Sequence, residues 1–523
     1  MKNKTQYFYN ALLLTAVSLV MRTVSVSFNV YVSNRVGAEA MGLLSLVSGV
    51  YGFAVTLATS GINLATVRLL SQRLERGGGS IWSALRACLA YAAFFGFLSS
   101  ALLFAFARPL GTLVLKDTRT IRALYVLSAT LLPIALCSVM NGYFTAMRRA
   151  WKSAVIQILE QSAKIGTTIY LLLFAAPKTV EGCLLAILLG GVCAELLSLL
   201  LNLLLFSLDR KGQYLKKAEK AEKCTSVRAI ALPVAISAYV RSGLLAIEHI
   251  LIPRGLLRFG SGNSEALSAY GALHSMALPV VLYPAAILSS FASLLIPEVT
   301  KEQSLDNRVQ IRYITGRVYQ VTLLFSIGAA GIMLCHSSEL GNALYQSKEV
   351  GEYIAALAPL IPIMYLDTCT DAMLKGLGEQ VYSMRVNILD ALTSVICVAI
   401  FVPRIGIAGY LLTIYITEVL NAVLSVTRLL RITGFSPSVI RLILRPLAAV
   451  IGATSLARLL QEPLWASGIK AAPFHICITA LFYLFLLVAL GGFGKSEMHW
   501  LGGFLIKRPQ KNDGSLKDLC EKP

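Results

Sequence analysis

The stretch SLDRKGQYLKKAEKAEKCTSVR, residues 207–228, decides how this chain is organised. It is basic and polar, whereas long apolar segments fill most of the sequence on both sides of it. Six such segments precede the stretch, six follow it, and two more lie near the end of the chain. Because roughly 20 apolar residues cross a bilayer, this pattern predicts an all-α integral membrane protein with about 14 transmembrane helices.

The composition of the whole chain supports a membrane protein. Hydrophobic residues make up 56% of the 523 residues and charged residues 14%, whereas a soluble domain carries about 25% charged residues. No segment alternates polar and apolar residues in the way an outer-membrane β-barrel requires. The ten cysteines and five histidines are dispersed, so we expect neither a metal site nor a resident cofactor.

The distribution of positive charge predicts the orientation of the chain. Most of the 47 lysines and arginines fall on the side of the membrane that holds both termini and the central basic stretch. This asymmetry is typical of cytoplasmic loops, so it accounts for the net charge of +20 without a nucleic-acid partner. We therefore expect a multi-pass protein of the bacterial cytoplasmic membrane with both termini in the cytoplasm.

Two parts of the sequence indicate an internal repeat. The segment AMRRAWKSAVIQILEQSAK (146–164) aligns with GLGEQVYSMRVNILDALTS (376–394), and Glu39-Ala40 aligns with Glu265-Ala266. A repeat of six spans keeps its orientation, so the two lobes would be parallel, as in some alternating-access transporters. The predicted parts are a six-span lobe at 1–207, a linker at 208–227, a second six-span lobe at 228–432, two added spans at 433–493 and a polar tail at 494–523.

Charged residues inside the apolar segments are the candidate functional residues, because a charge at mid-membrane costs about 3 kcal/mol. Arg22 and Arg241 lie in the opening spans of the two lobes and indicate an anionic substrate, since guanidinium grips phosphate oxygens. Interhelical ion pairs that only fix packing are the alternative. We expect such structural pairing where opposite charges lie four residues apart, namely at Glu160 and Lys164 and at Asp371 and Lys375.

Several stretches together resemble a known family. They are VMRTVSVSFN (20–29), the segment 35–65, EHILIPRGL (248–256), the segment 270–300 and the segment 374–410. They are similar to the stage V sporulation protein B group of polysaccharide transporters. That group lies in the multidrug/oligosaccharidyl-lipid/polysaccharide exporter (MOP) superfamily and is close to the lipid II flippases.

The resemblance implies a function and further site residues. The family is expected to flip an undecaprenyl-pyrophosphate-linked saccharide, here a lipid II-type peptidoglycan precursor for the spore cortex, by alternating access. Arg35, Arg68 and Arg254 match basic positions that would serve the anionic headgroup beside Arg22. Glu248 matches an acidic position, and with Asn29 it is the candidate for coupling to H⁺ or Na⁺. We expect a monomer whose partners are its lipid-linked substrate and the membrane lipids.

Three other functions stay open from the sequence. A cation-coupled multidrug exporter of the same superfamily would favour an acidic residue in the first span, which this chain lacks. A membrane glycosyltransferase would need paired acidic or histidine catalysts on an outer loop, and the short outer loops offer none as a motif. A non-transporting scaffold for spore-envelope assembly is the remaining alternative.

Overall fold

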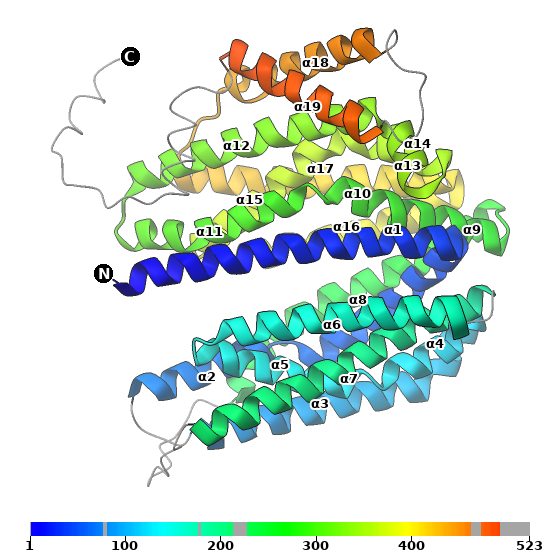
Figure 1. Cartoon of the computed structure of the whole chain (residues 1–523), viewed down its shortest axis with the longest axis vertical. Coiled ribbons are helices and arrows are strands. Elements are labelled where there is room, and N and C mark those ends of the chain that lie inside the picture. Colours follow the sequence, from blue (N-terminus) through cyan, green and yellow to red (C-terminus); the bar gives the residue numbers. More distant parts are fainter. Residues whose placement is uncertain (1, 77–80, 176–178, 213–226, 462–471, 492–523) are drawn as a thin grey trace.

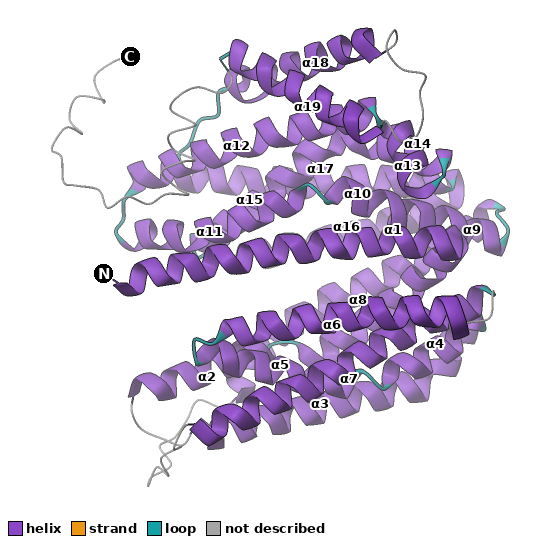
Figure 2. Cartoon of the chain, viewed as in Figure 1, coloured by secondary structure: helices purple, strands orange, loops and turns teal. Residues whose placement is uncertain are grey.

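The computed structural model describes residues 2–76, 81–175, 179–212, 227–461 and 472–491. All regular elements in these residues are helices (Figure 2). Most of the predicted linker and the whole predicted tail, 494–523, lie outside the described residues. The chain is therefore an all-α multi-pass membrane protein, as its sequence predicts.

The first half of the chain supplies seven α-helices, two of which continue into π-helices. In the long α-helices that cross the bundle, apolar runs are bounded by polar or glycine-containing turns. Figure 1 shows α2–α7 gathered on one side of the molecule. The elements are α1 (Lys2–Thr59), α2 (Ile62–Arg76), α3 (Ile81–Pro109), η1 (Leu110–Val114), α4 (Arg119–Ser128), α5 (Leu131–Ala146), α6 (Ala150–Tyr170), η2 (Leu171–Ala175) and α7 (Val180–Gly212).

The second half forms the other side of the molecule (Figure 1). Its first elements are α8 (Val227–Phe259), α9 (Asn263–Tyr270), the π-helix η3 (Gly271–Ala277), α10 (Leu278–Leu282), α11 (Ala285–Ser304) and α12 (Arg308–Cys335). Its next elements are α13 (Ser337–Tyr345), α14 (Lys348–Leu357), η4 (Ala358–Leu360), α15 (Ile361–Gly376), α16 (Gln380–Ile405) and α17 (Ile407–Thr433). The described chain ends with η5 (Ile440–Leu444), α18 (Arg445–Gln461) and α19 (Ala472–Ala489), which pack on α12.

The helix α1 supplies two membrane spans rather than one. Its 58 residues would extend about 87 Å as a straight helix, far more than the roughly 30 Å of a hydrocarbon core. Gly37 has φ 84° and ψ 169°, a conformation outside the helical region, and the chain reverses there. The first half of α1 runs along the boundary between the two groups of helices, and the second half returns toward α2 (Figure 1).

The described helices account for the predicted spans. Ten are long and apolar enough to cross a membrane, or eleven if α9–α10 and α11, bent by 56° at Tyr283 and Pro284, form one span. The predicted number of about fourteen also counts α1 as two spans and includes α6 and the shorter α19, so it stays a prediction.

The repeat seen in the sequence reappears in backbone geometry. The backbone N–H of Arg149 donates to the carbonyl of Phe144 at 2.8 Å, and the N–H of Glu379 donates to the carbonyl of Leu374 at 2.9 Å. The two bonds therefore lie at equivalent positions of the aligned segments. The preceding residue has a positive φ in each loop, 58° at Arg148 and 81° at Gly378. The two loops thus share one conformation, which supports the proposed division into two lobes.

An ion pair follows each of these loops, with its charges exchanged. Arg149 pairs with Asp209 at the end of α7 at 2.7 Å, whereas Glu379 pairs with Arg428 at the end of α17 at 2.7 Å. Both pairs tie the loop between the fourth and fifth spans of a lobe to the end of its sixth span. The acid and the base have exchanged places between the two pairs, so a comparison of residue types does not reveal that the pairs are equivalent.

Candidate functional site at the junction of the two halves

A row of small residues on the second half of α1 forms a tight seam with the other half of the chain. Gly42, Ser45 and Gly49 follow one another at helical spacing and face one way. A β-carbon on Gly42 would collide with the backbone carbonyl of Leu267, and a β-carbon on Gly271 would collide with the carbonyl of Ala38. Small residues allow such close approach of helices in membranes. We call these contacts of α1 with α9 and η3 the α1–η3 seam.

Hydrogen bonds continue the α1–η3 seam toward the middle of the bundle. The hydroxyl groups of Ser45 and Ser275 bond each other, and the hydroxyl of Ser275 also bonds the carbonyl of Met41 at 3.2 Å. The amide of Asn29 donates to the carbonyl of Ser275 at 2.8 Å. Both halves of α1 are therefore tied to η3 through one serine.

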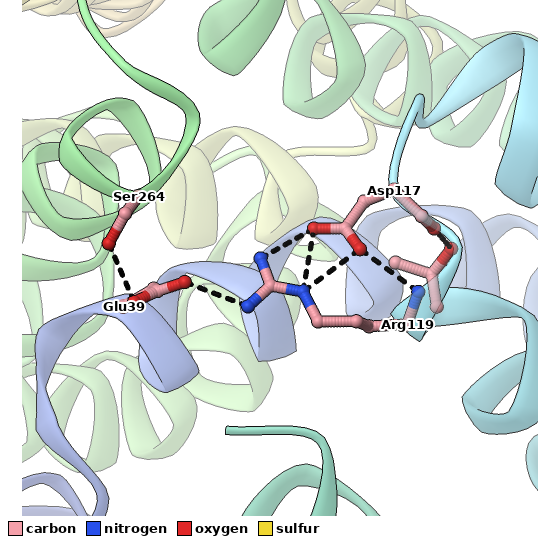
Figure 3. Close-up of polar contacts among 5 residues, drawn as sticks. Glu39, Asp117, Arg119 and Ser264 are labelled. Atoms are coloured by element: carbon pink, nitrogen blue, oxygen red, sulfur yellow. Dashed lines mark hydrogen bonds and ion pairs between the residues drawn. The ribbon is translucent and has the colours of Figure 1, made fainter. Parts of the chain in front are cut away.

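A polar cluster closes the end of the seam that lies away from the N-terminus (Figure 3). Arg119, at the start of α4, donates Nη1 to Glu39 of α1 at 2.8 Å. Its Nε and Nη2 atoms bond both carboxylate oxygens of Asp117 at 2.7 to 3.1 Å. Ser264 of α9 donates to the other oxygen of Glu39 at 2.6 Å. One arginine and one glutamate thus join α4, α1 and α9.

The cluster keeps Asp117 ionised. Burial alone would raise the pKa of the Asp117 carboxyl, but the hydrogen bonds and the positive charge of Arg119 outweigh burial and hold this pKa below its usual range. Asn263 of α9 also bonds the Asp117 carboxyl. The cluster therefore carries its full complement of charge at neutral pH and well into the acidic range.

Comparisons with known proteins show two similarities in sequence. The family model described as "Polysaccharide biosynthesis protein" matches residues 8–252. "Stage V sporulation protein B" of Bacillus subtilis (strain 168) is 24% identical over 434 residues, which cover 80% of this chain and 83% of that protein. The first half of the chain is therefore similar to polysaccharide biosynthesis proteins, and most of the chain is similar to stage V sporulation protein B.

Solved structures of two transporters share the fold of this chain. A lipid II flippase MurJ in an inward closed conformation has a TM-score of 0.69 and 13% identity, covering 91% of this chain and 98% of that one. An inward-facing MATE family multidrug transporter has a TM-score of 0.62 and 14% identity, covering 82% of this chain and 100% of that one. These two similarities establish the fold that the chain shares with transporters.

The arginines expected at a binding site lie at different depths of the MOP fold. Arg22 is exposed on the first half of α1, near Tyr365 of α15, and Arg241 is exposed on α8, near Asp390 of α16. Arg35 and Arg68 are also exposed, at opposite ends of the second span. Arg254 donates to the carbonyl of Leu113 at 2.6 Å, which joins α8 to η1.

The acidic candidates have defined neighbours in the second half. Glu248 lies near Ser394 on α16, and Asp390 lies close enough to act on it electrostatically. Lys375 pairs with Asp371, whose other oxygen accepts a hydrogen bond from Ser383. These contacts link α8 with α16 and α15 with α16.

The other predicted pair, Glu160 and Lys164, stays a prediction, but both residues lie near a third charged residue. Glu160 and Lys164 of α6 both act electrostatically on Glu195 of α7. The two carboxyl groups and the ammonium therefore belong to one group of charges between α6 and α7.

Sequence reasoning missed the residues that join the two halves. Arg119 and Ser264 did not stand out because each is an ordinary polar residue near a span end. The spacing of Gly42, Ser45 and Gly49 is a local signal that could have indicated a close helix contact. It could not have indicated which helix lies opposite.

Proposed function

We propose that this protein is a flippase that moves an undecaprenyl-pyrophosphate-linked saccharide across the bacterial cytoplasmic membrane by alternating access. The MurJ-like fold over 91% of the chain supports transport of a lipid-linked substrate, and the similarity to stage V sporulation protein B supports a precursor of the spore cortex. The seam and the polar cluster would form the outer closure, given the orientation that the positive charges predict.

One observation carries the choice of an anionic substrate. Arg22 and Arg241 are exposed within apolar helices, and an arginine facing lipid at mid-membrane would cost about 3 kcal/mol or more. Their exposure is therefore best explained by a wet space between the two halves, and α1 lies along that boundary (Figure 1). Two guanidinium groups in such a space suit a pyrophosphate headgroup.

The energy source fits the same site. Moving the negative pyrophosphate outward is favoured by an inside-negative potential, by about 2.3 kcal/mol per charge per 100 mV. Glu248 and its neighbour Asp390 offer a place where a coupling H⁺ or Na⁺ would bind, between α8 and α16. The hydrogen bond from Asn29 to the carbonyl of Ser275 would couple the first span to opening and closing of the seam.

The test is a flipping assay in proteoliposomes with a labelled lipid-linked saccharide. Arg22→Ala and Arg241→Ala should each slow flipping at least tenfold, because each removes a charge-assisted contact worth about 1.5–3 kcal/mol. Arg308→Ala is the matched control, since Arg308 is exposed at a helix start and its guanidinium lies 3.5 Å from the exposed Asp306. Equal rates for all three variants and the wild type would remove the headgroup site from this proposal.

The multidrug-exporter alternative is supported by one observation, the 0.62 TM-score to a MATE transporter. Export of cationic drugs by a sensitive host, lost in Glu248→Gln and kept in Arg22→Ala, would favour it. The lipids that co-purify with the protein, identified by mass spectrometry, separate the two: a lipid-linked pyrophosphate supports the flippase, and its absence beside measured drug export supports the exporter.

A further inference from the structure

Four aromatic rings meet at the α1–η3 seam, and neither the proposed headgroup site nor the coupling site uses them. Nδ1 of His249 on α8 lies 2.5 Å from the hydroxyl of Tyr270 on α9. Nδ1 of His274 in η3 lies 3.0 Å from the hydroxyl of Tyr410 on α17. The two imidazole rings are 4.9 Å apart between centroids. Each histidine therefore has its own tyrosine, and the two histidines contact each other.

His249 lies on α8 and extends the seam, because it packs against Gly49 of α1. A β-carbon on Gly49 would lie 2.6 to 2.9 Å from Cβ, Cγ and Cδ2 of His249, so this ring fills the space that a larger residue at 49 would need. Both histidines are partly exposed, whereas Tyr270 and Tyr410 are buried. A proton can thus reach the imidazoles without unfolding the core.

The hydrogen bonds between the two histidines and their tyrosines can accommodate one added proton on the imidazole pair. A tyrosine hydroxyl donates to a neutral imidazole nitrogen and, after rotating, accepts from an imidazolium N–H. The tyrosines therefore hold either form of the histidines in place. Two imidazolium ions at this separation would repel each other, so the pair takes a single proton.

A positive charge on the imidazole pair is partly compensated by a nearby carboxylate, but it lies where the closed seam offers it little hydration. Glu248, next to His249, acts electrostatically on Tyr270 and Tyr410 and is the carboxyl group that faces the cluster. The surface that α1 presents to His249 is Gly49, which offers a charged ring no side chain. An imidazolium pressed against this apolar seam loses hydration that it regains when α1 moves away.

We propose that His249 and His274 form a single-proton switch whose protonation opens the α1–η3 seam. Neutral imidazoles pack in the closed seam, and one proton on the pair favours the state in which α1 separates from α8 and η3. This inference rests on the proposed alternating access but not on the identity of the transported lipid.

The test measures the seam and not transport. Spin labels on non-canonical amino acids at Thr112 of η1 and Lys348 of α14 avoid the ten native cysteines, and both sites are exposed. The distance between them is measured by double electron–electron resonance in lipid nanodiscs without substrate. As the pH falls from 8 to 5, the population with the longer distance should rise at least fivefold, with its midpoint in the range where imidazoles titrate.

Variants decide whether the histidine pair is responsible. His249→Gln and His274→Gln keep a hydrogen-bonding side chain, and each should reduce the pH response at least threefold. His336→Gln is the control, because His336 contacts Thr479 and Glu339 at the far side of the second half. If His249→Gln lowers the melting temperature, His274→Gln alone decides, since it leaves the contact with Gly49 intact. A response unchanged in His274→Gln, or a wild-type distance that does not vary with pH, overturns the switch.

Because the assay contains no substrate, its outcome is independent of the flippase proposal. A pH-dependent seam in a protein that flips no lipid would keep the switch and reject the substrate. A fixed seam in a protein that flips lipid would do the reverse.

Discussion

Replacing Arg119 by Gln should open the end of the α1–η3 seam that lies away from the N-terminus. Arg119 is the residue that bonds both Glu39 of α1 and Asp117 before α4 (Figure 3). Glutamine removes the positive charge and is too short to span both carboxylates. Glu39 and Asp117 then face each other across the junction with their mutual repulsion uncompensated.

The size of the effect follows from the contacts that cross the junction. A hydrogen bond to a charged group is worth about 1.5–3 kcal/mol, and one such bond, from Arg119 to Glu39, joins α4 to α1. The side chains of Arg119 and Glu39 are 27% and 25% exposed, so water screens part of the interaction. We therefore expect a loss of about 1–2 kcal/mol, which changes the ratio of closed to open molecules by a factor of about 5 to 30.

The assay is the Thr112–Lys348 distance distribution described above, recorded at pH 8. The matched control is Arg122→Gln, because Arg122 is mostly exposed and pairs with Glu181 of α7 within the same half. Arg119→Lys should fall between wild type and Arg119→Gln, since lysine keeps the charge but not the paired geometry. Identical distributions for Arg119→Gln and Arg122→Gln would show that the cluster does not hold the seam.

Two further substitutions probe the seam and the fold. Gly42→Leu would place a side chain against the carbonyl of Leu267 and should shift the same distances toward the open state. Gly52→Leu should not shift them, because a β-carbon on Gly52 meets nothing within 4 Å. Equal effects of the two variants would contradict the tight seam. Asp209→Asn removes the buried partner of Lys152 and should lower the free energy of unfolding by about 3 kcal/mol, seen as a lower melting temperature. Asp306→Asn, at an exposed residue, should leave the melting temperature unchanged. Equal melting temperatures for the two variants would contradict a stabilising role for the Lys152–Asp209 pair.

The sequence predicted the all-α membrane fold because apolar length is a local signal, whereas the division into two lobes stays a prediction. Apolar length fixes which segments cross the membrane, and the described helices match them. The alignment of 146–164 with 376–394 was weak in residue identity, yet the two loops share hydrogen bonds and a positive φ at the same place. Backbone geometry was retained while side chains diverged, so the repeat is clearer in the structure than in the sequence.

The junction could not be predicted because its contacts are distant in sequence. Glu39 meets Arg119 across 80 residues and Ser264 across 225, and no pattern in one helix specifies a partner that far away. Arg254 shows the opposite difficulty: an arginine expected to bind a headgroup instead donates to a backbone carbonyl. Whether it also serves a substrate stays a prediction.

The seam combines two kinds of interaction that respond differently to pH. The folded-state pKa of Asp117 lies below its ordinary value of 3.8, so its contribution is present above that value and is lost only as the pH falls through the lower, folded-state pKa. Between pH 8 and 5 the cluster around Arg119 is therefore constant, and the histidine variants show whether a response in that range comes from His249 and His274. Arg119→Gln should consequently raise the open population by a similar factor at both ends of the range, while the histidine variants remove the difference between them.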